Sequence, residues 1–227
     1  MSAQVAGLTR TRSDGPLRFA VPRGALFAET LERLDAIGID TSELRGDSRS
    51  LIFEASDLVL VTMRPSDVPT YVESGAADVG ITGKDVLLEQ PERPVYELLD
   101  LGYGSCRMVV AARSGSASLA ELERRFGQVR IATKYLHIAE RYFEQTGRQV
   151  ELVEVKGSVE LAPVVGLADG IVDLVATGRT LIENDLEERE QILECSARFV
   201  ANRVSHKLRS DEVDNLTERL RQAEPGG

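Results

Sequence analysis

The sequence predicts an α/β protein, because strand-like and helix-like segments alternate along most of its length. Short apolar runs rich in Val, Ile and Leu end at Gly, Pro or hydroxyl residues, and most precede a segment with helical periodicity. This alternation favours largely parallel sheets with helices on their faces. Ligands of such sheets bind beyond the carboxyl ends of the strands, so the loops there are the first candidates for a functional site.

The first half of the chain contains three strand-loop-helix units. Pro65 is placed as the first residue of a helix, Gly75 as its end, and Thr82 as the cap of the helix that follows it. The strands are expected at residues 17–21, 57–63 and 78–81, and the helices at residues 26–37, 65–75 and 82–88.

The second half repeats the pattern. Ser118 and Glu121 have the spacing of a capping box before a charged amphipathic helix, and Gly147 follows another helix. Strands are expected at residues 106–112, 129–132, 149–153 and 171–175, and helices after Ser118 and at residues 135–146, 159–168 and 205–223. Composition alone does not divide the chain into domains, since no low-complexity linker interrupts it.

Composition excludes several classes of function. With 227 residues, 42% of them hydrophobic, the chain is long enough to bury a core as one large domain or two small ones. A formal net charge of -10 argues against nucleic-acid binding, which needs clustered Lys and Arg. The sequence has neither an apolar stretch of roughly 20 residues nor a secretory signal, so we expect a cytoplasmic protein that does not enter a membrane.

Cysteine and histidine offer little for catalysis. Cys106 and Cys195 are far apart in the sequence and belong to no metal-binding motif, so we expect buried, reduced thiols. Only His137 and His206 are present, too few for a multi-histidine metal cluster. The chemistry is therefore expected from carboxylates, Lys, Arg and backbone groups.

The most informative loop follows the strand that ends at Val175. Gly178 allows the backbone to approach a ligand, backbone N–H groups supply partial positive charge, and Thr177 and Thr180 can donate hydrogen bonds to phosphate oxygens. Asp173, just upstream, can accept hydrogen bonds from ribose hydroxyls. Alternatively, the segment is an ordinary strand-to-helix connection in which Gly178 turns and Thr180 caps the helix.

Basic residues follow several of the predicted strands. Arg23, Arg64, Lys84 and Lys134 each stand at or directly after such a strand, where cations from different strands can converge on a polyphosphate. Taken singly, a solvated surface charge is the more common explanation for each of them. Glu160 lies at the expected start of a helix, where it either stabilises the helix dipole or takes part in catalysis.

Several longer motifs, in this order, resemble one known family. Together they span the chain from Leu17 to about Leu208, which makes the resemblance far more specific than a single glycine loop. They are SRSLIF (48–53), RPSDVPTYVESG (64–75), GKDVL (83–87), VYELLDLG (95–102), ATKY (132–135), GSVELAP (157–163) and DLVATGRT (173–180). The sequence is similar to the short-form ATP phosphoribosyltransferases.

The resemblance implies a two-lobe fold like that of type II periplasmic binding proteins, with the active site in the cleft between the lobes. By this analogy the chain crosses between lobes near Gly104 and near Glu190. Lobe I would comprise residues 1–104 and 190–227, and lobe II residues 105–189, including the phosphoribosyl pyrophosphate loop.

The resemblance also implies the reaction that opens histidine biosynthesis. N1 of the ATP adenine displaces pyrophosphate from C1 of phosphoribosyl pyrophosphate, with Mg²⁺ carried by the diphosphate and no protein metal ligand. Arg49 and Arg64 are the expected catalytic residues, and Arg49 is expected to stabilise the departing pyrophosphate. The expected phosphoribosyl pyrophosphate site consists of Asp173, Ala176, Thr177, Gly178, Arg179 and Thr180, and the expected ATP or diphosphate site of Arg23, Lys84, Lys134 and Glu160.

Members of the short form work in a hetero-oligomer with a regulatory subunit that resembles histidyl-tRNA synthetase, and a similar partner is expected here. One departure from the family is Ala25, which stands where a second Arg is common. Two other functions remain open from the residues alone. A solute-binding module would share the fold, and a phosphoribosyltransferase acting on a free base would share the phosphate loop but would bind no triphosphate.

Overall fold

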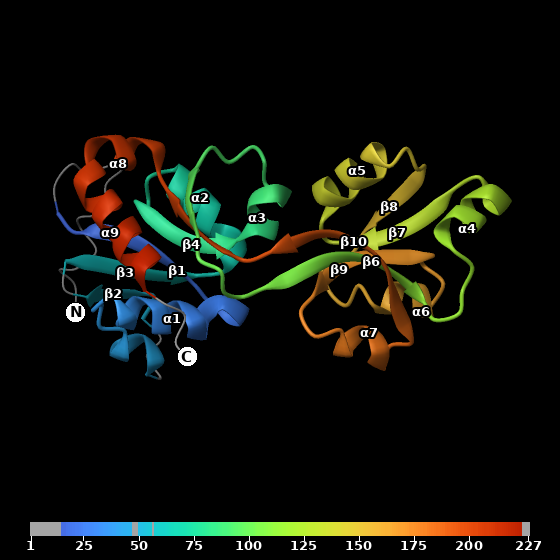
Figure 1. Cartoon of the computed structure of the whole chain (residues 1–227), viewed down its shortest axis with the longest axis horizontal. Coiled ribbons are helices and arrows are strands. Elements are labelled where there is room, and N and C mark those ends of the chain that lie inside the picture. The colour runs from blue at the N-terminus through green and yellow to red at the C-terminus, as the bar shows by residue number, and fades with distance from the viewer. Residues whose placement is uncertain (1–14, 47–49, 56, 224–227) are drawn as a thin grey trace. The chain divides into compact units, whose positions relative to one another are not determined.

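The computed structural model describes residues 15–46, 50–55 and 57–223. The chain forms two compact units: unit 1 comprises Met1–Gly104 and Ser196–Gly227, and unit 2 comprises Ser105–Cys195 (Figure 1). The expected second boundary, near Glu190, lies inside strand β10 (Leu186–Cys195). This strand stays paired with its neighbour as far as Cys195, so no connection interrupts it at Glu190.

Unit 1 is built on a mixed sheet with the strand order β2-β3-β1-β4-β11-β5. β3, β1 and β4 run parallel, while β2, β11 and β5 pair antiparallel with their neighbours. The strands are β1 (Leu17–Pro22), β2 (Ile52–Ala55), β3 (Leu58–Met63), β4 (Val79–Gly83), β5 (Tyr96–Asp100) and β11 (Ala197–Ala201). The helices are η1 (Gly24–Leu26), α1 (Phe27–Ala36), η2 (Ser42–Arg45), η3 (Pro65–Asp67), α2 (Val68–Glu73), α3 (Lys84–Glu89), α8 (Arg203–Leu208) and α9 (Ser210–Gln222).

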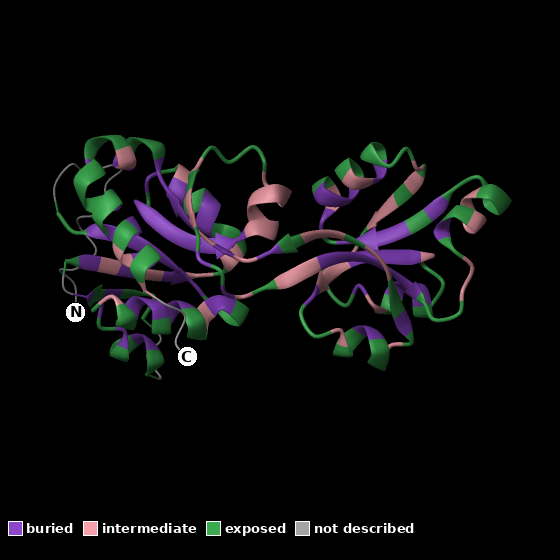
Figure 2. Ribbon diagram, viewed as in Figure 1, coloured by how far each residue is buried: buried purple, intermediate pink, exposed green. Residues whose placement is uncertain are grey.

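The core of unit 1 lies on both faces of its central strands. On one face Phe19 stacks on Phe199 with ring centroids 5.8 Å apart, and leucines from α1 and α9 pack around them. On the other face α2 covers Ala20 and Val200 through Val68 and Val72. The central strands β1 and β4 are accordingly buried throughout (Figure 2). Burial on both faces explains why their sequences are mostly apolar.

Unit 2 contains a second mixed sheet with the strand order β10-β6-β9-β7-β8. β9, β7 and β8 are parallel, and β6 pairs antiparallel with β9 on one side and β10 on the other. The remaining strands are β6 (Cys106–Arg113), β7 (Val129–Thr133), β8 (Val150–Glu154) and β9 (Gly170–Val175). The helices are α4 (Leu119–Phe126), α5 (Leu136–Gln145), α6 (Leu161–Val164) and α7 (Arg179–Glu183).

Local sequence signals explain the start of α4. The Ser118 side chain accepts a hydrogen bond from the Glu121 N–H, and the Glu121 carboxylate accepts one from the Ser118 N–H in return. The capping box predicted from these two residues is confirmed. Such a box satisfies backbone donors that the first helical turn leaves unpaired.

Three expected helices differ in the structure. Thr82 does not cap α3 but lies in β4, where its hydroxyl donates to the Pro65 carbonyl oxygen at 2.8 Å. The helix expected over residues 159–168 is reduced to the single turn α6, because Gly166 adopts a left-handed conformation with φ of 76°. The C-terminal helix is divided into α8 and α9 at Arg209, whose φ of -131° is not helical.

No helix among the described residues is both long enough and apolar enough to cross a membrane.

Candidate functional site

The loops after β9, β7 and β8 gather the predicted unit 2 residues at one edge of its sheet. These three strands are parallel neighbours, so their carboxyl ends lie side by side. Lys134 directly follows β7, and the loop of residues 176–180 directly follows β9. Glu160 belongs to the segment between β8 and α6, and its charge acts on Asp173 of β9.

The loop of residues 176–180 turns at Gly178 and leaves several backbone N–H groups without an acceptor among the described residues. Gly178 has φ of 80°, in the left-handed region that favours glycine, and it immediately precedes α7. Within the described residues, the N–H groups of Thr177, Gly178 and Thr180 have no hydrogen-bond acceptor. The N–H of Arg179 is 3.4 Å from the Thr177 hydroxyl oxygen. Several backbone donors are therefore available to an anion at the end of β9.

Asp173 is the most perturbed carboxylate at this edge. Its side chain is 14% exposed, and its Oδ1 atom lies 3.7 Å from Lys134 Nζ, an ion-pair distance too long for a hydrogen bond. Burial raises the pKa of Asp173; the charge of Lys134 lowers it and that of Glu160 raises it. Asp173 Oδ1 is buried and accepts no hydrogen bond from the described residues. An acceptor in this state is suited to a hydroxyl group of a ligand.

Lys134 is placed by the turn that follows β7. The buried Thr133 hydroxyl donates to the Val172 carbonyl oxygen at 2.7 Å and accepts from the Tyr135 N–H at 2.9 Å. The Lys134 ammonium lies 4.9 Å from the centre of the Tyr135 ring. These contacts hold the ammonium beside Asp173 and identify Thr133 as a supporting residue that the sequence analysis did not single out.

Unit 1 presents three predicted cations at the carboxyl edge of its own sheet. Arg23, Arg64 and Lys84 follow the parallel strands β1, β3 and β4, respectively. The Arg23 N–H donates to the Met63 carbonyl oxygen at 2.7 Å, which ties the ends of β1 and β3 together. Arg64 is exposed, and the Arg23 guanidinium lies 5.6 Å from the centre of the Phe27 ring.

Lys84 is not a free cation in this structure. Its Nζ lies 2.7 Å from Glu97 Oε2, and Glu97 also lies 3.6 Å from Arg198 Nη1. The same Arg198 nitrogen contacts Asp100 at 2.6 Å. The carboxylates come from β5, a strand that the sequence analysis did not predict, so neither this network nor Arg198 was foreseen.

Arg49 lies outside the described residues, so its expected role stays a prediction. Ala25, the departure from the family pattern, is exposed in η1 directly after Arg23 and Gly24. An alanine there contributes no charge to this edge of the sheet.

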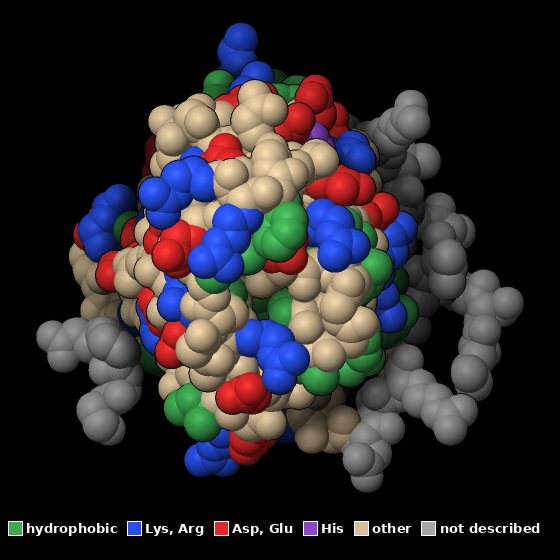
Figure 3. All heavy atoms as spheres, turned by 90° about the vertical axis from the view of Figure 1, so that its right-hand side faces the viewer, with side chains coloured by type: hydrophobic (Ala, Val, Ile, Leu, Met, Phe, Trp, Pro, Cys, Tyr) green, Lys and Arg blue, Asp and Glu red, His purple; other side chains and the backbone are tan. Residues whose placement is uncertain are grey.

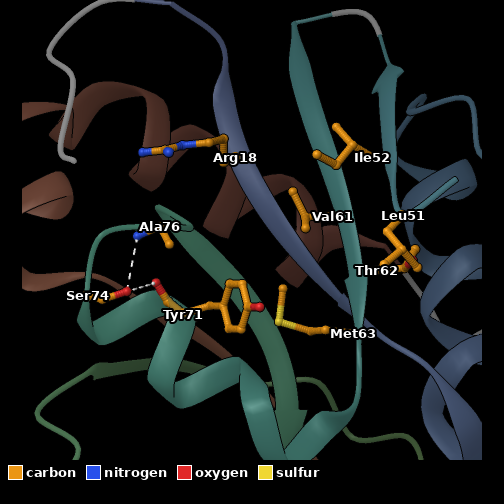
Figure 4. A pocket seen from close by; sticks show the side chains of 9 residues that line it. All are labelled: Arg18, Leu51, Ile52, Val61, Thr62, Met63, Tyr71, Ser74 and Ala76. Carbon is orange, nitrogen blue, oxygen red and sulfur yellow. Dashed lines mark hydrogen bonds between the residues drawn. The ribbon is translucent and has the colours of Figure 1, made fainter. Parts of the chain in front are cut away.

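An open pocket of about 470 Å³ lies on the α2 face of the unit 1 sheet. Figure 4 shows Ile52, Val61 and Met63 from β2 and β3 on one side and Tyr71 from α2 on the other. Arg18 also borders the pocket, but its guanidinium already donates to the Gly75 carbonyl oxygen and lies 3.7 Å from Asp78. None of the predicted site residues that the structure describes lines this pocket.

The charges on the surface are mixed in sign on the side that Figure 3 displays. Lys and Arg side chains stand next to Asp and Glu side chains there, without a broad field of one sign. This agrees with local rather than extended recognition of anions.

The fold and the two sheet edges define a two-unit α/β protein suited to phosphate-bearing ligands. The family model described as HisG, ATP phosphoribosyltransferase, matches residues 64–222. An ATP phosphoribosyltransferase of Rubrobacter xylanophilus is 53% identical over 201 residues, covering 88% of this chain and 93% of the relative. One of Desulfitobacterium hafniense is 44% identical over 213 residues, covering 91% of this chain and 95% of the relative.

Solved structures agree with the sequence relatives. A chain of the ATP phosphoribosyl transferase (HisG:HisZ) complex from Thermotoga maritima superposes with a TM-score of 0.77 at 36% identity, covering 91% of this chain and 98% of that one. The aliphatic sulphonate binding protein SsuA of Escherichia coli matches with a TM-score of 0.61 at 12% identity, covering 92% of this chain and 72% of that one, a likeness of fold alone. This chain belongs to the ATP phosphoribosyltransferase family. The expected family and the periplasmic-binding-protein-like fold are thus confirmed.

Proposed function

We propose that this chain transfers the 5-phosphoribosyl group from phosphoribosyl pyrophosphate to N1 of ATP, releases pyrophosphate, and thereby performs the first step of histidine biosynthesis. Family membership supports the reaction. The proposal rests on the edge of the unit 2 sheet. There the N–H groups of Thr177, Gly178 and Thr180, which have no acceptor among the described residues, follow the strand that carries the buried Asp173 acceptor. A phosphate can accept hydrogen bonds from the N–H groups, and a ribose hydroxyl can donate one to the Asp173 carboxylate.

In the proposed mechanism, residues of unit 2 hold the phosphoribosyl group in position. The N–H groups of Thr177, Gly178 and Thr180, with the threonine hydroxyls, bind the 5-phosphate. Asp173 Oδ1 accepts a hydrogen bond from the ribose, and the Lys134 charge lowers the pKa of that carboxylate, against the effects of burial and of Glu160. Holding the ribose in this way orients C1 for attack, and orientation alone can lower a barrier substantially.

The cations of unit 1 serve the diphosphate and triphosphate. Positive charge near the leaving group stabilises the charge that develops on it in the transition state. Arg49 and Arg64 take this role, while Arg23 and Lys84 bind ATP or diphosphate oxygens. When Lys84 does so, its ammonium must share its donors between phosphate and Glu97, which lies 2.7 Å away.

Divalent metal is a general requirement of the family, and we assign it to Mg²⁺ held by the diphosphate oxygens. Hard oxygen donors of this kind are the ligands that Mg²⁺ prefers, and the bound ion would reduce the charge of the leaving group. The protein contributes the arginines around the diphosphate rather than a dedicated metal cage.

A regulatory partner is the second part of the proposal. The related Thermotoga maritima chain occurs in a HisG:HisZ complex, and we propose that this chain likewise assembles, in the cytoplasm, with a subunit resembling histidyl-tRNA synthetase. If histidine binds that partner, inhibition depends on a difference in histidine affinity between two states of the assembly.

A single assay tests the catalytic proposal. The purified chain is mixed with ATP, phosphoribosyl pyrophosphate and Mg²⁺, with and without the partner, while phosphoribosyl-ATP is followed by absorbance and pyrophosphate by a coupled enzyme. Equal formation of both products supports the reaction. Tight binding of free adenine with no binding of ATP would instead indicate a phosphoribosyltransferase that acts on free bases.

The regulatory proposal has its own measurement. Initial rates are compared across a histidine titration for the chain alone and for the reconstituted complex. We expect inhibition of the complex at concentrations that leave the chain alone unaffected. Equal sensitivity of the two would place the histidine site in this chain.

A further inference from the structure

The two cysteines of the chain face each other in the unit 2 sheet. Cys106 is the first residue of β6 and Cys195 is the last residue of β10, and the two are paired in the antiparallel ladder between these strands. They are separated by most of unit 2 along the chain, and they are the only cysteines in the sequence. We propose that Cys106 and Cys195 form a reversible cross-strand disulfide, making this end of the sheet a redox modification site.

The register of the ladder is what brings the cysteines together. β10 contains two irregularities, between Glu188 and Glu190 and between Gln191 and Leu193. If the register of the Leu186–Arg113 pair continued without them, Cys106 would face Leu193 instead of Cys195. After the second irregularity the pairing runs without a break through Leu193–Met108 and Glu194–Arg107 to the cysteine pair.

Residues opposite each other in an antiparallel ladder meet the geometric requirement of a disulfide. Their Cα atoms are about 4.5 or 5.5 Å apart, depending on the type of pair, and their side chains lie on the same face of the sheet. Disulfides span Cα separations of about 4.4 to 6.8 Å. Both types of pair therefore allow the bond without a large movement of the strands.

The two thiols differ in accessibility, which sets the order of the reaction. Cys106 is half-buried, whereas Cys195 is 3% exposed. A low-molecular-weight disulfide would be attacked by the Cys106 thiolate, forming a mixed disulfide and releasing one small thiol. The Cys195 thiolate then attacks the Cys106 sulfur, forms the protein disulfide and releases the second small thiol. The protons of both cysteines end on the released thiols, so the oxidant is reduced by the electrons that the protein loses.

The position of the two cysteines at the ends of unit 2 determines how the disulfide would affect stability. Ser105 is the first residue of unit 2 and Cys195 is the last, so the disulfide would join the two places where the chain enters and leaves this unit. It would close a loop that contains nearly the whole of unit 2. A cross-link across so long a loop restricts the unfolded chain and favours the folded state. Disulfides of cytoplasmic proteins are most often transient and redox-sensing, which is the behaviour we propose here.

The test uses the full chain and oxidised glutathione as the oxidant, without any substrate of the enzyme. After exposure and removal of excess reagent, we expect the thiol count in denaturant to fall from two to none. The intact mass should decrease by two hydrogen atoms and carry no glutathione. The thermal unfolding midpoint should rise, and dithiothreitol should reverse all three changes.

Two variants separate the steps. Cys195→Ser should stop at the mixed disulfide and carry one glutathione on Cys106, with an unfolding midpoint that does not rise. Cys106→Ser should remain unmodified while folded, because Cys195 is buried. Wild-type protein that keeps both thiols, or that retains glutathione on Cys106 without forming the internal bond, would overturn the proposal. The deciding measurements are made on the wild-type protein, so they remain valid even if a variant folds poorly.

Discussion

The two sheet edges that we propose to bind phosphate groups differ in the kind of donor they present. Both lie at the carboxyl ends of parallel strands, but unit 1 presents the long cationic side chains of Arg23, Arg64 and Lys84, whereas unit 2 presents backbone N–H groups and hydroxyls from a five-residue loop. Long side chains can follow a charge that moves during the reaction. A backbone loop is fixed and suits a group that stays in place, such as a 5-phosphate.

The largest expected effect is on the unit 1 side. Arg49→Ala should lower the single-turnover rate by about 100-fold while weakening substrate binding much less, because its contact strengthens as charge develops on the pyrophosphate. Arg45→Ala serves as the control, since Arg45 is engaged with Asp35 on the surface at 2.6 Å. If Arg49→Ala raised only the Michaelis constant, Arg49 would bind the ground state and the proposed contrast between the edges would fail.

The next effect belongs to unit 2. Thr180→Ala should weaken phosphoribosyl pyrophosphate binding about tenfold and leave ATP binding unchanged, because one hydrogen bond to a charged phosphate is lost. Thr146→Ala is a matched control in the same unit, where the hydroxyl donates to the Tyr142 carbonyl oxygen at 3.0 Å. Calorimetric titration with each ligand measures both constants. Equal weakening of the two ligands would remove the distinction between the edges.

The variant Gly178→Ala tests whether the backbone conformation of the loop contributes to phosphoribosyl pyrophosphate binding independently of the loop side chains. Gly178→Ala should reduce the free energy of unfolding by about 1 kcal/mol, because φ of 80° is unfavourable for alanine, and should also weaken phosphoribosyl pyrophosphate binding. Gly127→Ala imposes the same strain after α4, where φ is 76° and a methyl group meets no atom within 4 Å. Urea unfolding should give similar losses for the two variants. Only Gly178→Ala should affect binding, and a matching loss of binding in Gly127→Ala would refute the assignment.

The smallest effects concern carboxylates whose pKa values shift in opposite directions. Burial raises the pKa of Asp173, so its contribution to stability is present at acidic pH and is lost as the pH rises through that raised value. Asp173→Asn should therefore stabilise the protein at neutral pH, with little change at acidic pH, while weakening phosphoribosyl pyrophosphate binding. Urea unfolding at both pH values measures the first effect, and a destabilised variant at neutral pH would contradict it.

Glu190 supplies the opposite case away from the proposed site. Hydrogen bonds from Arg148 lower the pKa of Glu190, so its stabilising contribution is present at neutral pH and is lost as the pH falls through the lowered value. Because Glu190 is partly exposed, Glu190→Gln should cost less than about 1 kcal/mol at neutral pH. Turnover should not change. A loss of turnover would mean that the charge of Glu190 affects the reaction although Glu190 lies outside the proposed site.

Sequence patterns were sufficient for the parallel strands and for β6, but they missed the antiparallel strands β2, β5, β10 and β11. β1, β3 and β9 are short apolar runs between turn residues, and all were predicted within a residue or two. β10 was missed because LEEREQILEC contains four glutamates and an arginine, which no strand pattern predicts. Its pairing with β6 across the whole of unit 2 is a long-range contact that overrides local preference.

For the candidate site, too, some features could be predicted from the sequence and others could not. Lys134 and the loop of residues 176–180 could be placed because strand-end position follows from the order of strands and loops. The buried state of Asp173 and the Glu97 contact of Lys84 could not, because both depend on which strands become neighbours. Likewise, no sequence pattern associates Cys106 with Cys195, because two irregularities in β10 decide their register.

The charged character of β10 has a further consequence for how this protein behaves in a concentrated solution. β10 is an edge strand of the unit 2 sheet, and the backbone groups on its outer side are a template for pairing with a strand of another molecule. Glutamates and two irregularities make that edge repulsive and uneven, so a second copy would find it difficult to extend the sheet. The same residues that hide this strand from sequence analysis thereby help the protein to resist aggregation.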